Sequence, residues 1–257
     1  MFERRFLLSV EMTGTTILQR KKVTLLLNGE TMKYMDREFQ KLKKKTLSLA
    51  GFVEECVEMA VKAIDKKDQK LAEEVLIRGV EVDHMEVDLE EDCLKILALY
   101  QPVAIDLRFV VSVFKINNDL ERISDLADNI AERAIFLASR DVEIPFDFSG
   151  MTEKTITMVN KSLDALVNLD PAKAYQVCAM DDEVDAINRD MYKQIKKAIE
   201  ADPNKTEALL HLLGVSRHLE RIADHATNIA EDVIYMIDGI IIRHKTEDYC
   251  KIPEKYL

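Results

Sequence analysis

Apolar side chains recur at helical spacing along most of the chain. The pattern begins near Met32 and is interrupted mainly by prolines, as at Pro171 and Pro203. An apolar period of about 3.6 residues predicts amphipathic α-helices. Asp170 and Asp202 stand directly before the two prolines, a combination typical of a helix start. The sequence therefore predicts six helices, over residues 32–64, 68–99, 103–139, 151–168, 171–200 and 203–243.

Two segments of thirteen residues are nearly the same. Residues 120–132 read LERISDLADNIAE and residues 219–231 read LERIADHATNIAE, so ten of thirteen positions agree at an offset of 99. Upstream, residues 81–83 match residues 183–185 at an offset of 102. The chain is thus an internal duplication. Six helices in two equivalent halves predict an all-α fold of two tandem, pseudo-symmetric three-helix bundles.

Pro145 and Gly150 mark the link between the two halves. We predict a first bundle over residues 32–144 and a second over residues 150–244. Residues 1–31 have no counterpart in the second half, so they are expected to be a non-core N-terminal extension, with position 32 a candidate natural start. Residues from 245 onward are expected to form a loose tail.

Acid and amide side chains form one stripe on each repeated helix, opposite the predicted core face. Steps of three and four residues place them on the same side of a helix. Asp83 in one half, and Asp181 with Asp185 in the other, lie on the preceding helices and are expected beside the stripes. The stripes consist of Glu121, Asp125, Asn129 and Glu132 in the first half and of Glu220, Asp224, Asn228 and Glu231 in the second.

Two interpretations of these stripes are open. Acidic residues opposite a core usually form a solvated face. The detailed duplication, and the scarcity of Lys or Arg four residues away, favour instead a site that a cation compensates. Oxygen ligands suit Fe(III), Mn, Mg or Ca better than Cu or thiolate-bound Zn. The predicted metal ligands are Asp83, Glu121, Asp125, Asn129, Asp181, Asp185, Glu220, Asp224 and Asn228.

Three histidines recur every seven residues on the last helix, at His211, His218 and His225. This stripe is turned away from Glu220 and Asp224, with His225 the closest to the acidic stripe. We interpret it as a stripe that flanks the core or the other bundle; the alternative is a separate interface or a pH-sensitive contact. No Glu-x-x-His pair occurs, which disfavours a ferritin-like di-iron enzyme.

Composition narrows the function further. The formal charge of −11 argues against nucleic-acid binding, because phosphate neutralisation needs a basic surface. The four cysteines are scattered without paired spacing, as expected of reduced thiols in a cytoplasmic protein. No apolar run approaches a membrane span, so membrane association is expected only through partners. Nucleophile, phosphate-loop and metalloprotease motifs are lacking, which predicts a protein that is not an enzyme.

The doubled motif, together with QPVAIDLR at residues 101–108, resembles the signature of the PhoU family over about residues 32–239. The resemblance implies two three-helix bundles in an accessory protein of the phosphate-specific ABC transporter. It implies a negative regulator of the phosphate-starvation response that couples the transporter to a membrane sensor histidine kinase. A homodimer is also expected. Some members bind multinuclear metal clusters, iron above all, through paired E(D)xxxD motifs; Mn, Zn, Mg or Ca are the other candidates.

Carried over to this sequence, three of these motifs are complete: Glu121 with Asp125, Glu220 with Asp224, and Asp181 with Asp185. The fourth should involve Asp83, but Gly79 stands four residues before it. The first site is therefore expected to be weaker, to hold fewer ions, or to recruit Glu81 or Glu86. The rival functions are a metal-dependent enzyme built on the carboxylate cluster and a metal-free helical dimerisation module.

Overall fold

The computed structural model describes the backbone of residues 2–140, 148–242, 253 and 256, and side chains from residue 34 onward within these ranges. This part of the chain is helical throughout, without a strand. A short 3-10 turn, η1, precedes the last helix. The elements are α1 (Phe2–Lys66), α2 (Gln69–Tyr100), α3 (Ala104–Ala138), α4 (Ser149–Asn168), α5 (Pro171–Ala201), η1 (Pro203–Lys205) and α6 (Thr206–Asp238).

Local capping explains where the helices begin and end. The carboxylate of Asp68 accepts hydrogen bonds from the backbone N–H groups of Lys70 and Leu71 at the start of α2. Asp170 caps α5 in the same way, with proline at the first helical position. These bonds satisfy amides that have no partner inside the helix. At the end of α6, Gly239 takes a φ of 70°, a left-handed conformation that costs glycine little.

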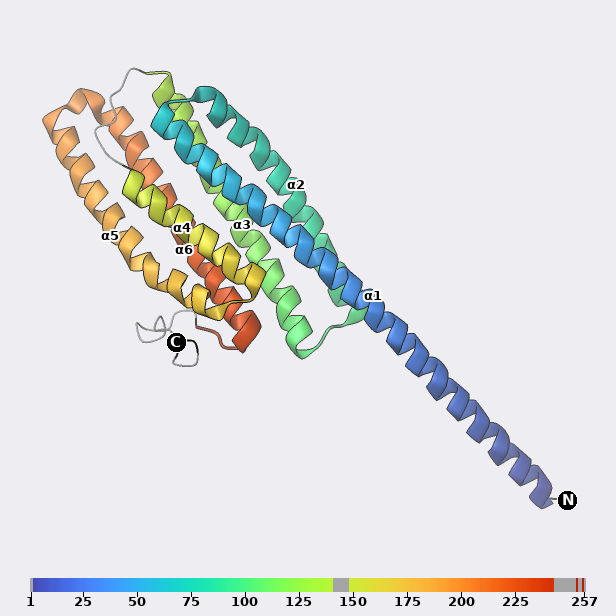
Figure 1. Cartoon of the computed structure of the whole chain (residues 1–257). Helices are drawn as coiled ribbons and strands as arrows, with labels where there is room; N and C mark the ends of the chain where they lie inside the picture. The colour runs from blue at the N-terminus through green and yellow to red at the C-terminus, as the bar shows by residue number, and fades with distance from the viewer. Residues whose placement is uncertain (1, 141–147, 243–252, 254–255, 257) are drawn as a thin grey trace.

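The helices form two antiparallel bundles, α1–α3 and α4–α6 (Figure 1). α3 and α6 pack against each other at the centre, and α1 also contacts α4, so one continuous core joins the two bundles. The predicted core faces of the repeated helices are buried, as Ile123, Ile130, Ile222 and Ile229 show. The prediction of two tandem three-helix bundles is confirmed.

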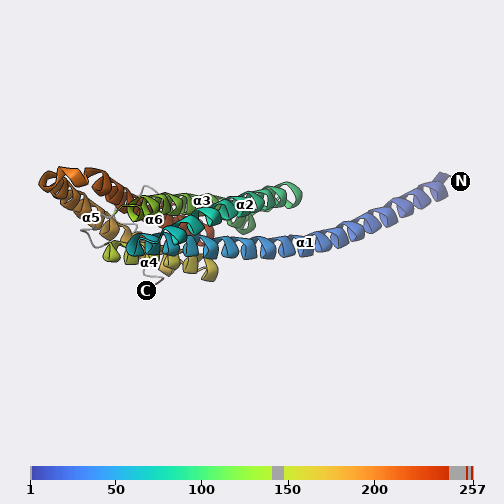
Figure 2. The same cartoon turned by 90° about the horizontal axis from the view of Figure 1, so that it is seen from above.

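Two predicted helix boundaries are wrong. α1 does not begin near Met32 but is continuous from Phe2, and its ribbon projects beyond the bundles (Figures 1 and 2). α6 ends at Asp238 rather than at position 243 because Gly239 turns the backbone out of the helix. The predicted link falls mostly on residues 141–147, and the predicted tail mostly on residues 243–257, outside the described residues.

No helix within the described ranges is long and apolar enough to cross a bilayer. Cys56, Cys93 and Cys178 are buried. Burial raises the pKa of the Cys56 thiol to about 11 and that of Cys93 to about 12. Both thiols are therefore protonated near neutral pH and are poor metal ligands. The candidate metal ligands are thus the oxygen atoms of acidic and amide side chains.

Candidate metal centres on the two bundles

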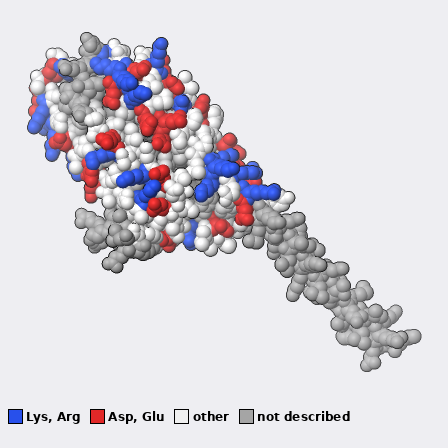
Figure 3. Space-filling model, in the orientation of Figure 1, with Lys and Arg blue, Asp and Glu red and all other residues white. Residues whose placement is uncertain are grey.

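Carboxylates from two helices converge on the surface of the first bundle. Asp83 of α2 meets Glu121 and Asp125 of α3, and each offers an oxygen atom within 4.8 Å of the other two. Asp83 is exposed, and the α3 carboxylates are partly buried. Lys, Arg, Asp and Glu side chains intermingle over the face that Figure 3 shows, so the acidic character is local. We call this group, Asp83, Glu121 and Asp125, the first acidic centre.

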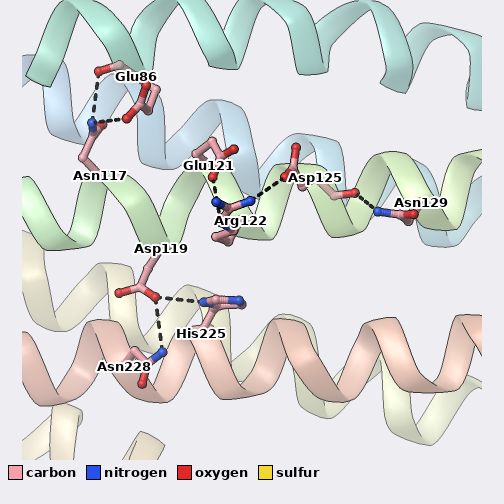
Figure 4. Close-up of polar contacts among 9 residues, drawn as sticks. All are labelled: Glu86, Asn117, Asp119, Glu121, Arg122, Asp125, Asn129, His225 and Asn228. Atoms are coloured by element: carbon pink, nitrogen blue, oxygen red, sulfur yellow. Dashed lines mark hydrogen bonds and ion pairs between the residues drawn. The ribbon is translucent and has the colours of Figure 1, made fainter.

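Mutual repulsion within the first acidic centre is only partly compensated. The pKa of Glu121 is raised by burial and then by Asp125, with smaller contributions from Glu86 and Asp83. Arg122 opposes this shift. Its Nη1 lies 3.2 Å from Asp125 Oδ2 and its Nε lies 3.3 Å from Glu121 Oε2 (Figure 4). Glu121 Oε2 is nevertheless buried without a hydrogen-bond partner. One arginine does not saturate these oxygens.

A related group lies between α5 and α6. Burial first, and then the charges of Asp224 and Asp185, together raise the pKa of Asp181 to about 6. The pKa values of Glu220 and Asp224 are also raised, first by burial and then by the neighbouring carboxylates. The hydroxyl of Thr227 donates to Asp181 Oδ1 over 3.3 Å. We call Asp181, Asp185, Glu220 and Asp224 the second acidic centre. Among the described residues, only the first centre brings three ligand oxygens within 4.8 Å.

Comparison with known protein families also divides the chain into two similar halves. A family model described as the PhoU domain matches two segments of the chain, residues 46–134 and 148–233. The chain belongs to the PhoU family. A "phosphate-specific transport system accessory protein PhoU homolog" of Aquifex aeolicus is 39% identical over 210 residues, which are 81% of this chain and 95% of that protein.

Solved structures agree with the fold. The crystal structure of PhoU from Pseudomonas aeruginosa superposes with a TM-score of 0.78 at 35% identity, covering 80% of this chain and 99% of that one. The structure of a "phosphate transport system regulatory protein PhoU" from Streptococcus pneumoniae gives a TM-score of 0.72 at 27% identity, covering 80% and 98%. The two-bundle PhoU fold is therefore shown for this chain.

The side-chain amides of the two stripe asparagines bind groups other than the carboxylates of the acidic centres. Asn228 Nδ2 donates to Asp119 Oδ1 of α3 over 3.2 Å, and His225 Nδ1 lies 2.8 Å from the same oxygen (Figure 4). Asn129 Nδ2 donates to the backbone carbonyl of Asp125 over 2.6 Å. Each step of four residues overshoots a helical turn by about 40°, which turns Asn228, the third residue of its stripe, toward α3. The amide groups of both asparagines are thus engaged elsewhere.

The histidine stripe of α6 faces the other bundle, as predicted. His225 contacts Asp119 of α3, and the ring of His211 stacks on Phe136 of α3 with centroids 3.7 Å apart. His218 has both ring nitrogens buried without a hydrogen-bond partner. Burial, followed by Arg133, lowers the pKa of His218 to about 4. Among the described residues, none of the three rings forms a hydrogen bond or ion pair with a predicted metal ligand.

Of the two residues expected to replace the missing carboxylate at position 79, only Glu86 borders the first centre. Its Oε1 accepts a hydrogen bond from Asn117, and its pKa is raised by burial, Glu90 and Asp83 (Figure 4). Glu81 is exposed and stays outside the group of converging oxygens. Sequence reasoning missed a nearer carboxylate, Asp128 of α3. Burial first, and then the charges of Asp125 and Asp83, together raise its pKa to about 7.

The donor set fits a hard cation. All the converging ligands are carboxylates, an oxygen donor set that suits Fe(III), Mn, Mg and Ca. Glu121 Oε2 and Asp128 Oδ1 are both buried without a hydrogen-bond partner in the structure. Leaving such oxygens unsatisfied is costly, and a cation would satisfy them. The residues of the first acidic centre are therefore compatible with a bound metal.

Proposed function

We propose that this PhoU-family protein is a non-enzymatic accessory protein of phosphate-specific ABC transport that also represses the phosphate-starvation response. In this proposal it is an adaptor between the transporter and a membrane sensor histidine kinase. Metal ions, iron first among the candidates, occupy its two acidic centres and set the shape and charge that partners meet. The names of its relatives support the accessory role.

The observation that carries the metal part of this proposal is the convergence of Asp83, Glu121 and Asp125. A bound cation would remove their repulsion and turn an anionic face into a neutral or cationic one, able to accept phosphate or a partner's carboxylate. It would also stabilise the fold by RT ln(1 + [L]/Kd), about 2.7 kcal/mol at a hundredfold excess over Kd. Metal occupancy is thereby coupled to the recognised surface.

The exposed position of these centres favours binding over catalysis. Asp83 is exposed and the side chain of Asp125 is 46% exposed. Catalytic carboxylates usually work in a concave pocket from which water is largely removed. The metal-dependent enzyme is therefore the weaker candidate function.

A protein partner would find its apolar anchor on the outer face of α2. Ile77, Val80, Val87 and Leu94 are each more than half exposed and recur at spacings of three and seven residues. Exposed apolar side chains grouped on one helix face are typical of interaction surfaces. A second copy of the chain could use the same face, and light scattering of the purified protein tests the predicted homodimer.

The metal part is tested by elemental analysis of protein purified without a metal-affinity column. Wild type is expected to carry stoichiometric metal, and Glu220→Ala/Asp224→Ala and Glu121→Ala/Asp125→Ala are each expected to lose one centre's share. Glu153→Ala/Glu200→Ala is the matched control, because it removes two exposed glutamates outside both centres. Metal-free wild type would overturn this part of the proposal.

The regulatory part is tested in cells that lack their own PhoU and carry a phosphate-starvation reporter. Wild type should restore repression in high phosphate, and the two centre variants should restore it less. Equal repression by wild type and by both centre variants would separate regulation from metal binding. No repression by wild type would contradict the regulatory role itself.

A further inference from the structure

The two acidic centres differ at one pair of positions that the duplication relates. The second helices of the two halves correspond at an offset of 102, and the third helices at an offset of 99. In the second half, this pair is Asp181 on α5 and Thr227 on α6, which share a hydrogen bond of 3.3 Å. In the first half, the same positions hold Gly79 on α2 and Asp128 on α3. The carboxylate has moved from one helix to its neighbour.

The structure shows why the two substitutions belong together. A Cβ atom added to Gly79 would overlap the carboxylate of Asp128, with Cγ and Oδ1 both only 2.8 Å away and Oδ2 closer still. The Asp128 side chain therefore occupies the space that any side chain at position 79 would enter. An aspartate at position 79 and the observed placement of Asp128 exclude each other sterically.

We infer that Asp128 supplies the fourth carboxylate of the first metal centre from α3, in place of the aspartate that position 79 lacks. This inference rests on the proposed metal function. Asp125 and Asp83 are among the nearby charges that act on Asp128, and both belong to the first acidic centre. Asp128 Oδ1 is buried without a hydrogen-bond partner, as is Glu121 Oε2. Asp128 Oδ1 is thus available to a cation, which would compete only with Arg122 for Glu121 Oε2.

Each half then presents four carboxylates to a hard cation. The first centre comprises Asp83, Glu121, Asp125 and Asp128, and the second keeps Asp181, Asp185, Glu220 and Asp224. The loss of the motif residue at Gly79 does not reduce the number of oxygen ligands. The first centre is expected to bind as many ions as the second, rather than fewer.

The decisive experiment exchanges the two arrangements. In the Glu220→Ala/Asp224→Ala background, which isolates the first centre, Mn²⁺ binding is titrated by electron paramagnetic resonance for Asp128→Thr and for Gly79→Asp/Asp128→Thr. Asp128→Thr should weaken Mn²⁺ binding at least about tenfold. Removing a residue that only hydrogen-bonds to a metal ligand already costs about tenfold or more in affinity, and removing a ligand should cost no less. The double variant copies the second half and should recover most of the binding.

Two further variants keep the test interpretable. Asp128→Asn preserves side-chain volume and should lose Mn²⁺ affinity like Asp128→Thr, while circular dichroism confirms the fold. Glu132→Gln removes the other nearby acidic charge, from an exposed residue, and should change binding much less. Unchanged Mn²⁺ affinity in both Asp128 variants would make Asp128 a buried acid with no ligand role.

The isolated second centre separates this inference from the proposed function. If Glu121→Ala/Asp125→Ala still binds Mn²⁺ but the first centre ignores changes at Asp128, only the inference fails. If neither isolated centre binds Mn²⁺ and wild type does not either, the metal function fails and the inference fails with it.

Discussion

The two ends of the α3–α6 interface are related by the duplication. Each end contains a basic side chain, Lys115 at one and Arg133 at the other, and the two side chains have different partners. At one end, Lys115 Nζ lies 2.9 Å from Asp232 Oδ1, with the ring of Tyr235 5.8 Å from the ammonium group. At the offset of 99, the position equivalent to Lys115 is Gly214, and the position equivalent to Asp232 is Arg133. At the other end, the Arg133 side chain lies so close to Gly214 that a Cβ atom added there would overlap it. Arg133 Nη1 donates a hydrogen bond to the backbone carbonyl of Asn129.

The two ends share their helix packing and differ in their charged residues. Both ends keep the helix backbone and the apolar core residues, so the packing of α3 on α6 is retained. The charged positions have diverged into an ion pair at one end and an arginine packed over a glycine at the other. The described residues show no ion pair between Arg133 and a carboxylate. The two ends should therefore respond differently when their cations are removed.

The largest effect is expected for Lys115→Met. The side chain of Asp232 is only 2% exposed, so the substitution leaves a buried carboxylate without its ammonium group. Removing one partner of a buried ion pair typically costs 3–5 kcal/mol, and the partial exposure of Lys115 places this case at about 3 kcal/mol. Chemical denaturation of wild type and variant measures the loss.

Arg133→Met is the matched control at the other end. It removes one hydrogen bond to a backbone carbonyl and relieves the desolvation that lowers the pKa of Arg133. The net change should stay below about 1 kcal/mol. Equal losses for the two variants would contradict the assigned difference between the ends.

A smaller effect is expected for Gly79→Ala, which adds the Cβ that overlaps Asp128. Overpacking of this kind costs about 2 kcal/mol. In the Asp128→Thr background the overlap with the carboxylate is removed, and alanine should then favour the helix by up to about 1 kcal/mol. Thermal unfolding of the four proteins in a chelating buffer gives the double-mutant cycle. Additive effects would show that residues 79 and 128 are independent.

The architecture could be predicted from the sequence because long helices record their boundaries locally. Asp170 before Pro171 predicted the start of α5 correctly, since the cap depends only on neighbouring residues. The end of α6 was predicted too late, although Gly239 was visible in the sequence. Apolar residues continue after the glycine, so the apolar pattern alone predicts a longer helix.

The acidic centres could be predicted only in part, because stripes on single helices do not show how neighbouring helices meet. Glu121 and Asp125 converge with Asp83 as expected, whereas Asn228 turns to Asp119 across the interface. Asp128 was missed because it differs from Thr227 within the repeated motif. The sequence did contain a signal: the first half has Asp128 where the second has Thr227, and Gly79 where the second has Asp181. It has a physical meaning only once α2 and α3 are seen to touch.

A further effect, confined to mildly acidic pH, concerns His218, which the duplication relates to Asp119. Asp119 is held by His225 and Asn228, while both ring nitrogens of His218 lack partners. Burial and the nearby Arg133, Arg221 and Arg217 lower its pKa from 6.5 to about 4. As pH falls from 6.5 toward 4, the unfolded chain takes up a proton that folded His218 refuses, so the fold loses stability.

His218→Leu removes this titration, so the stability of wild type relative to the variant should fall by on the order of 1 kcal/mol between pH 7 and pH 5. The acidic centres titrate in both proteins and cancel in the difference, provided metal is chelated. His84→Leu, at an exposed histidine of α2, controls for the loss of an imidazole. A difference between wild type and His218→Leu that does not change with pH would show that His218 accepts a proton in the fold, and hence that its end of the interface tolerates a second cation beside Arg133.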